Sequence, residues 1–258
     1  MEMNEASAKL ALTEEEVRSI LHAADNIVGR AGRTMLVKIL KGSRDKKLLA
    51  LGLDDSAEYG YYRSLTMANI TERVDWMIKH DYLAISWDGD MSVLVFTERG
   101  WEIQREQMAD LLLAQWRAWV EAGVPVTDMT YLKDRNRGMI LLFLQKVANS
   151  GDARYIPLLQ QWELVDYKKV RQAIREVIAH LNNGAGERFI LEGAPVVELA
   201  DRPLIEERKS ERLKCWECGK RFEWTVEEQD RFRMEGWDPP KRCRKCRGAQ
   251  RNRLRLLE

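Results

Sequence analysis

Four cysteines place the strongest constraint on what this chain can fold into. Cys215, Cys218, Cys243 and Cys246 are all the cysteines among its 258 residues, and they form two Cys-x2-Cys pairs. In a reducing compartment this repeated spacing indicates a metal site rather than disulfide bonds. Zn²⁺ binds four thiolates in a tetrahedron, and four cysteines leave no coordination position open for catalysis. We therefore predict one structural Zn²⁺ ion, held by these four thiolates in a small C-terminal zinc ribbon.

The segment between the two pairs predicts its own structure. It is 24 residues long, which is more than the commonest ribbons contain. Thr225 and Glu228 have the spacing of a capping box, so "VEEQDRFRMEG" is expected to form a short helix that uses the additional length. After the second pair, "RGAQRNRLRLLE" predicts a basic helix or arm. Arg251 and Arg253 in this arm are candidate contacts to phosphate, although a basic arm can also serve only solubility.

The zinc segment resembles a family of small bacterial zinc-ribbon domains. Its "CWECGKRFEWT" corresponds to a Cys-x-x-Cys-Gly-Lys-x-Phe-x-Trp-Thr start, and its "PKRCRKCR" to a Pro-x-Arg-Cys-x-x-Cys-Arg end. The resemblance implies a structural metal and no established chemistry.

Positive charge is concentrated in two places, although the whole chain has a formal net charge of only +1. Residues 29–49 carry a net charge of +6, and residues 241–258 a net charge of +7. Binding to a polyanion depends on local rather than total charge. The two regions therefore predict phosphate binding at two defined places, with solvated surface as the alternative.

The first hundred residues predict helices followed by a β-hairpin. Thr13 and Glu16 form a second capping-box pattern before a helix in "EEEVRSILHAADNI". Further helices are predicted in "AGRTMLVKIL", "RDKKLLALG" and "MANITERVDWMIKHDYL" from their apolar periodicity. The run "LAISWDGDMSVLVFT" predicts a hairpin that turns at Asp88-Gly89. Helices and a hairpin in this order make a winged helix, a fold that presents a helix and a β-wing to nucleic acid.

Gly42 and Ser43 interrupt the most basic part of this segment. Glycine is unfavourable inside a helix and serine favours caps, so we predict two helices joined at a Gly-Ser corner. The second helix is expected to begin at Ser43 with free N–H groups beside Lys41 and Arg44. Such a helix start would attract an anion.

The same segment resembles the RQC domain, the winged helix of RecQ-type helicases, over about 90 residues. The residues that carry the resemblance are "LTEEEVRSIL", "GRAGRTMLVKILKGSRDKKLLALGLDDSAEYGYYRSLT", "WMIKHDYL" and "VLVFTERG". The family binds duplex ends, junctions and quadruplexes, with the Gly-Ser corner on phosphate and the wing at the duplex end. By this resemblance Lys41, Gly42 and Ser43 contact phosphate, and Arg63 takes the place of a family lysine.

Two positions depart from the family pattern. Tyr62 stands where the family usually has glycine, and the wing tip is short and acidic, which argues against deep strand separation. Trp87 at the tip is expected either to stack on a terminal base or to pack in the core, and Tyr62 has the same two interpretations. The candidate nucleic-acid contacts are Arg30, Arg33, Lys41, Gly42, Ser43, Arg44, Lys46, Lys47, Tyr62, Arg63, Trp87, Arg251 and Arg253.

The middle of the chain predicts a small helical bundle. "REQMADLLLAQWRAWV" and "GMILLFLQKVA" read as helices, the second of them buried because it is apolar almost all round. "GDARYIPLLQQWELVDYKKVRQAIREVIAHL" resembles one HEAT-type repeat, which must pack on the preceding helices because one repeat cannot bury its own core. We interpret this segment as a spacer, a surface for a protein partner or a module that adds stability.

These patterns predict a mainly α-helical protein with little β-structure: a winged helix at 1–104, a helical HEAT-like segment at 105–184, a linker at 185–210 and a zinc ribbon at 211–258. The 258 residues contain no Gly-x4-Gly-Lys-Ser/Thr loop and no nucleophile-base pair in a recognisable motif, so we expect neither an ATP-driven motor nor an enzyme. Without a signal peptide or a membrane span, a cytoplasmic or nucleoid location is expected.

The predicted function is therefore binding to duplex, end or junction DNA through backbone phosphates. Two alternatives stay open at this point. In the first, the chain is a protein-interaction adaptor whose winged helix and zinc ribbon are docking modules. In the second, the ribbon and basic arm bind RNA. The sequence carries no indication of oligomeric state.

Overall fold

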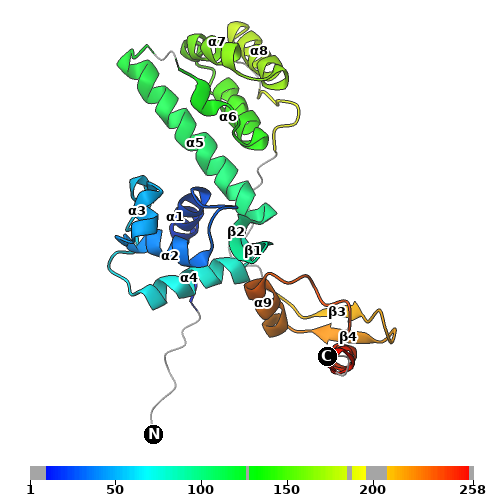
Figure 1. Ribbon diagram of the computed structural model, residues 1–258. Coiled ribbons are helices and arrows are strands. Elements are labelled where there is room, and N and C mark those ends of the chain that lie inside the picture. Colours follow the sequence, from blue (N-terminus) through cyan, green and yellow to red (C-terminus); the bar gives the residue numbers. More distant parts are fainter. Residues whose placement is uncertain (1–9, 126–127, 185–187, 196–207, 256–258) are drawn as a thin grey trace. The chain divides into compact units, whose positions relative to one another are not determined.

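The computed structural model describes residues 10–125, 128–184, 188–195 and 208–255, with the backbone alone for 251–255. The chain divides into two compact units, which we call the first unit (Met1–Gly100 with Pro203–Glu258) and the helical unit (Trp101–Arg202). Figure 1 shows that helices dominate, and the sheets among the described residues are two antiparallel two-stranded hairpins. Within these ranges no helix is both long and apolar enough to cross a bilayer.

The N-terminal part of the first unit is a winged helix, as predicted. Its elements in chain order are α1 (Glu14–Asp25), α2 (Arg33–Lys41), α3 (Lys46–Ala50), η1 (Leu53–Asp55), α4 (Met67–Lys79), β1 (Leu83–Asp88) and β2 (Met91–Phe96). The core lies between α1, α2, α4 and the hairpin, where Ile20, Leu36, Val74 and Leu94 are fully buried.

Local sequence signals explain where these elements begin and turn. The capping box before α1 is confirmed, because Thr13 Oγ1 accepts the Glu16 N–H at 3.2 Å and the Glu16 carboxylate accepts the Thr13 N–H at 2.9 Å. The hairpin is confirmed as well, but Asp88 pairs with Met91. Its turn is therefore Gly89-Asp90, one residue later than predicted, with Gly89 in the left-handed region at φ 57°.

The zinc-binding part of the first unit comes after the helical unit in the sequence. It consists of β3 (Glu211–Lys214), β4 (Arg221–Trp224), α9 (Val226–Glu235) and α10 (Arg244–Arg255). The predicted helix between the cysteine pairs is α9, and Thr225 Oγ1 accepts the Glu228 N–H at its start. A small aromatic cluster joins α9 to its surroundings, since the ring of Phe232 packs edge-on against Trp224 and Trp237.

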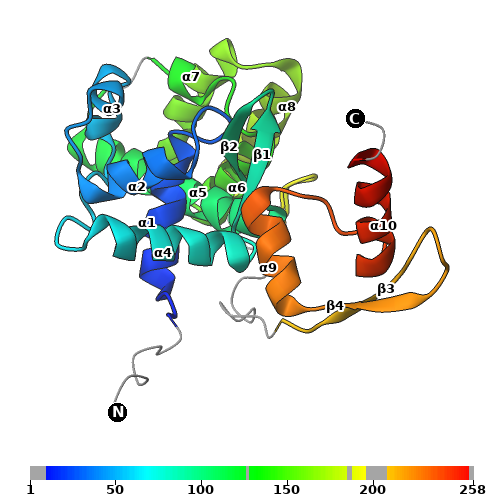
Figure 2. The same ribbon diagram turned by 60° about the horizontal axis from the view of Figure 1, so that its bottom comes forward.

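Helix α9 also packs against α4 and β1 of the winged helix (Figures 1 and 2). Two arginines of the zinc-binding part, Arg208 and Arg233, donate to the carbonyl oxygen of Lys79 at 2.9 and 3.1 Å. Lys79 is the last residue of α4, where carbonyl groups lack partners within the helix. Arg208 in turn forms an ion pair with Asp230 of α9. The zinc-binding part is thus joined to the end of α4 through polar contacts that satisfy the helix terminus.

The helical unit begins within α5 (Glu98–Ala122), which starts directly after the hairpin. The predicted boundary between residues 104 and 105 therefore lies inside a continuous helix. The remaining elements are η2 (Thr130–Leu132), α6 (Arg137–Asn149), η3 (Ala153–Tyr155), α7 (Ile156–Val165) and α8 (Lys168–Asn182). Trp116 lies at the centre of the core, where its ring packs edge-on against Phe143 and Trp162.

Candidate nucleic-acid interface and metal centre

The chain between α2 and α3 turns at Gly42, as the sequence predicts. Gly42 is left-handed, with φ 72° and ψ 44°, and follows the last residue of α2. The Gly42 N–H donates to Ile39 O at 2.9 Å, and the Ser43 N–H donates to Lys38 O at 3.0 Å. These bonds close the C-terminus of α2 in the manner of a Schellman motif, which favours glycine at the left-handed position.

The predicted helix start at Ser43 is wrong, because α3 begins three residues later and Asp45 is its cap. The Asp45 carboxylate accepts the N–H groups of Lys47 at 3.0 Å and Leu48 at 3.3 Å. It also accepts a hydrogen bond from Lys38 Nζ at 2.8 Å, and this contact lowers the Asp45 pKa together with the helix amides. The chain's own carboxylate therefore occupies the place of the predicted anion, and the Ser43 N–H is engaged within α2.

A close approach of two glycines brings the corner to a second loop. A Cβ atom on Gly42 would lie 3.0 Å from the Gly60 Cα, so the two backbones nearly touch. The exposed Arg63 side chain lies over both glycines, 3.1 Å from the position of a Gly60 Cβ. Lys41 Nζ donates to the carbonyl oxygens of Arg63 and Leu65, at 2.7 Å each. We call Lys41, Gly42, Ser43 and Arg63 the corner, and in it Lys41 holds the loop that carries Arg63.

A second arrangement of cations lies between the start of α2, the hairpin and the end of α9. It is a groove of about 570 Å³, which we call the wing groove. Its basic lining residues are Arg30, Arg33, Lys38 and Lys47, and Trp87 and Met91 line it from the hairpin. The sequence placed these residues in one basic segment but did not show that they surround a concave surface beside the wing.

Two of these four cations are already paired, and two are not. Arg33 contacts Asp75 at 2.7 Å, and Lys38 contacts Asp45 at 2.8 Å. Arg30 and Lys47 are exposed and form no ion pair within the described ranges, and the same holds for Arg44 and Lys46, which do not line the groove. Unpaired cations are the ones that can exchange their counterions for phosphate.

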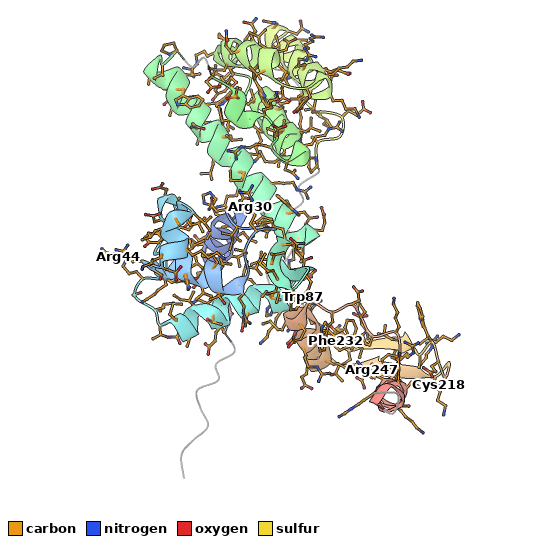
Figure 3. The ribbon with its side chains drawn as sticks, viewed as in Figure 1. Arg30, Arg44, Trp87, Cys218, Phe232 and Arg247 are labelled. Atoms are coloured by element: carbon orange, nitrogen blue, oxygen red, sulfur yellow. The ribbon has the colours of Figure 1, made fainter. Side chains whose placement is uncertain are left out.

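Trp87 lies at the hairpin beside α9 (Figure 3). Its indole N–H donates to the carbonyl oxygen of Glu235 at 3.0 Å, yet 53% of its surface is exposed. Gly236 follows at φ 66°, and a Cβ there would lie 2.7 Å from Ile85 O and 3.1 Å from Trp87 Nε1. The zinc-binding part therefore holds one edge of the tryptophan and leaves the rest of the ring open. Sequence reasoning missed this contact, and an isolated glycine at a helix end was its only local signal.

Tyr62 is not available for nucleic acid, which corrects that prediction. Its side chain is 7% exposed, and its hydroxyl donates to Glu16 Oε1 at 2.9 Å. Burial, together with this carboxylate, raises the pKa of the Tyr62 hydroxyl. The Arg73 guanidinium covers the ring at 5.3 Å. Tyr62 thus packs between α1 and α4, the alternative interpretation of this residue.

The predicted contacts in the C-terminal arm lie outside what the structure describes in side-chain detail. Arg251 and Arg253 lie in α10, but the structure describes only their backbone and not their side chains.

The four cysteines converge on one point, as predicted. Their Sγ atoms all lie within 4.8 Å of one another, and Cys218 Sγ is 4.0 Å from Cys243 Sγ. Zinc–sulfur bonds of about 2.3 Å in a tetrahedron require sulfur atoms roughly 3.8 Å apart, so the arrangement fits Zn²⁺. Backbone N–H groups of Cys218 and Cys243 lower the pKa of Cys215, which favours the thiolate that a metal needs. The neighbouring thiols raise the pKa of Cys246, as expected of sulfur atoms this close together.

The fold around the metal site differs from a ribbon with two equivalent turns. Cys215 and Cys218 lie on the turn between β3 and β4, where Cys215 N donates to Lys220 O at 2.9 Å. Cys243 precedes α10 and Cys246 lies in its first turn. A hairpin turn and a helix start therefore supply two ligands each. Arg247 ties this helix to α9, since it donates to Glu228 at 2.5 Å (Figure 3).

Comparison with known families agrees with both resemblances. Residues 13–113 match the model of the RQC domain, and residues 210–255 match the model of a probable treble clef domain. The latter agrees with the predicted four-cysteine zinc domain and specifies its fold as a treble clef, with one cysteine pair at the start of a helix. The 258 residues thus carry an RQC domain and a treble-clef zinc site, and both modules are non-catalytic binding domains.

A curated relative matches the first of these domains. The ATP-dependent DNA helicase RecQ of Bacillus subtilis (strain 168) is 26% identical over 113 residues, which are 44% of this chain and 18% of the helicase. The chain therefore spans less than a fifth of that protein's length. No solved structure matches the chain, so the HEAT-like description of α7 and α8 stays a prediction.

Proposed function

We propose that this chain, which carries an RQC domain and a treble-clef zinc site, binds duplex-containing DNA through the phosphates of the DNA backbone and catalyses no reaction. The observation that carries the proposal is the wing groove, where Arg30 and Lys47 are exposed and without ion pairs in the described ranges. These residues lie in the segment that matches the RQC domain. The name of the related helicase states that it acts on DNA, and we extend DNA binding from it to this chain.

The arrangement of the cations supports a contact to the DNA backbone. Arg30 and Lys47 line the wing groove, whereas Arg63 belongs to the corner. Side chains of these types bind phosphate by charge and release counterions, with an affinity that does not depend on the base sequence. Ser43 adds a hydroxyl at the corner, where its Oγ can donate to a phosphate oxygen.

Preference for a duplex end or a junction is part of the proposal. Trp87 offers an exposed aromatic surface at the edge of the wing groove, next to the cations that would hold the backbone. A terminal base pair has an open face that stacks on an aromatic ring, whereas the interior of a duplex has none. We therefore expect ends and branch points to bind more tightly than a continuous duplex.

We expect the double variant Arg30→Ala/Lys47→Ala to bind duplex DNA more weakly than the unchanged chain. Two lost phosphate contacts should reduce the magnitude of the slope of log K against log salt concentration by about 1.8. The measurement is fluorescence anisotropy with blunt, forked and four-way-junction DNA over a range of salt concentrations. Single-stranded DNA and duplex RNA belong in the same series, because they separate DNA binding from general binding to polyanions.

Arg154→Ala/Arg175→Ala is the matched control. It removes the same number of positive charges from the helical unit, at residues that already pair with Asp152 and Glu163. If the control lowers the salt slope as much as the groove variant does, total charge governs binding and the wing groove is not the site. If no DNA binds at moderate salt, the adaptor interpretation replaces this proposal.

Asp45→Asn is expected to strengthen DNA binding. The variant keeps an oxygen that can cap α3, but it loses the carboxylate that pairs with Lys38, so a third cation of the wing groove becomes free. The salt slope should become steeper by about 0.9 if Lys38 then contacts one phosphate. Asp45→Ala serves as the comparison, since it also removes the cap and should cost about 1 kcal/mol of stability. Unchanged affinity for Asp45→Asn would show that Lys38 faces no DNA.

A further inference from the structure

The helical unit carries a second cationic groove, and the sequence analysis predicted no binding site at its residues. It has a volume of about 450 Å³ and lies where the loop before α6 meets the start of α8. Leu132, Ile140 and Val170 supply its apolar lining, and Arg135, Arg137, Lys168 and Lys169 supply its charge. We call it the helical-unit groove.

The cations of this groove are exposed and lack carboxylate partners within the described ranges. Some other cations of the same unit are paired, since Lys146 contacts Asp110 at 2.7 Å and Arg175 contacts Glu163 at 2.6 Å. A polyanion would find its counter-charges here without breaking an existing ion pair.

Two acidic residues border the groove, but donors of the chain already engage their oxygens. Asp134 accepts the Tyr167 hydroxyl at 2.8 Å. Asp166 accepts the Trp162 indole N–H at 2.7 Å and the Tyr167 N–H at 2.6 Å. These carboxylates therefore position the aromatic residues and leave the cations of the rim unpaired.

Tyr167 adds an aromatic surface among these cations. Its side chain is 57% exposed, and its hydroxyl is held by Asp134. Lys133 Nζ lies 5.1 Å from the centre of the ring, which is the distance of a cation–π contact. A tyrosine held in this way is an ordered platform on which a base can stack.

We propose that the helical-unit groove binds a single-stranded segment of DNA, with phosphates on Lys168, Lys169 and the two arginines and with a base against Tyr167. Cations that surround an exposed aromatic ring and an apolar floor suit unpaired bases, because paired bases offer no free face for stacking. The inference rests on the proposed function, since it assigns the single-stranded part of the same DNA to the second unit.

The test compares a blunt duplex with the same duplex extended by a single-stranded thymidine tail, using the full zinc-loaded chain. The tail should raise the affinity of the unchanged chain, and Lys168→Ala/Lys169→Ala and Tyr167→Ala should each reduce that gain about tenfold. Tyr167→Phe should retain most of it, because the ring remains. Arg154→Ala/Arg175→Ala, in the same unit, should leave the gain unchanged. Thermal unfolding of each variant shows that its surface change left the unit folded.

The outcomes separate this inference from the proposed function. The inference is supported if the variants lose the affinity that the thymidine tail adds while they bind the blunt duplex as before. An unchanged gain in the variants, or an equal loss for blunt and tailed DNA, overturns it. If the blunt duplex fails to bind the unchanged chain, the proposed function fails, while Lys168-dependent binding of the thymidine strand alone would still support the groove. Lys168-dependent binding of polyglutamate without a tail gain would identify an acidic protein as the partner and overturn the inference.

Discussion

Removal of zinc with a chelator is expected to unfold residues 211–255 and to weaken DNA binding together with them. The module has two strands of four residues each and a small buried cluster around Trp224 and Phe232. So small a core cannot offset the entropy of ordering the chain without additional linkage. Zinc binding contributes about 10 to 16 kcal/mol to such sites, and this energy is folding energy because the unfolded chain has no preformed site.

The loss should extend to the wing groove. Met234 and Glu235 of α9 form one wall of this groove, and Glu235 holds the indole of Trp87. Unfolding of α9 therefore opens the groove and releases the tryptophan. We expect lower affinity for duplex DNA, a change in tryptophan fluorescence and loss of hydrogen-exchange protection in α9, all of which should return when zinc is added back.

Cys218→Ser provides the matched control for the chelator. The variant lacks one ligand, so it should show the same losses before a chelator is added and little further change afterwards. A chelated chain that keeps the protection of α9 and its DNA affinity would show that the module folds without the metal, and this prediction would then be wrong.

Local chemistry explains which parts of this structure could be predicted from the sequence. The capping box of Thr13 and Glu16 and the turn at Gly42 depend on residues within a few positions of one another, and both were predicted. The four cysteines are a second such case, because their spacing restricts the geometry of the ligands even without knowledge of the surrounding fold. The predicted structures follow from backbone requirements that a short window of sequence contains.

Most of what the sequence did not show depended on contacts between distant segments. For Tyr62 the sequence left open whether the ring stacks on a base or packs in the core, because its burial depends on Glu16 and Arg73, which no local pattern connects to it. Asp45 was overlooked as a cap because the Gly-Ser pair before it looked like a complete helix start. Trp87 and Glu235 are 148 positions apart, so the wing groove became visible only once the zinc module was placed against the hairpin.

Substitution of Gly236 is expected to separate the zinc module from the winged helix without removing the metal. The residue has φ 66°, a conformation that costs other residues about 1 to 2 kcal/mol. A Cβ atom would also lie 2.7 Å from Ile85 O, which is backbone of β1 and cannot move aside as a flexible side chain could. The Gly236→Ala variant must therefore shift the end of α9 away from the hairpin, and the bond from Trp87 to Glu235 should be lost.

We expect Gly236→Ala to bind one zinc ion with unchanged stoichiometry, because no cysteine ligand is affected. Duplex binding should weaken, and hydrogen exchange should rise in β1 and at the end of α4, where Arg208 and Arg233 contact Lys79. Gly123→Ala is the matched control, since Gly123 has φ 64° but open space around its Cβ position. It carries the conformational cost alone and should leave duplex binding unchanged. If Gly236→Ala keeps both the exchange protection of β1 and the affinity for duplex DNA, then contact between α9 and the hairpin does not shape the DNA-binding surface, and the winged helix binds by itself.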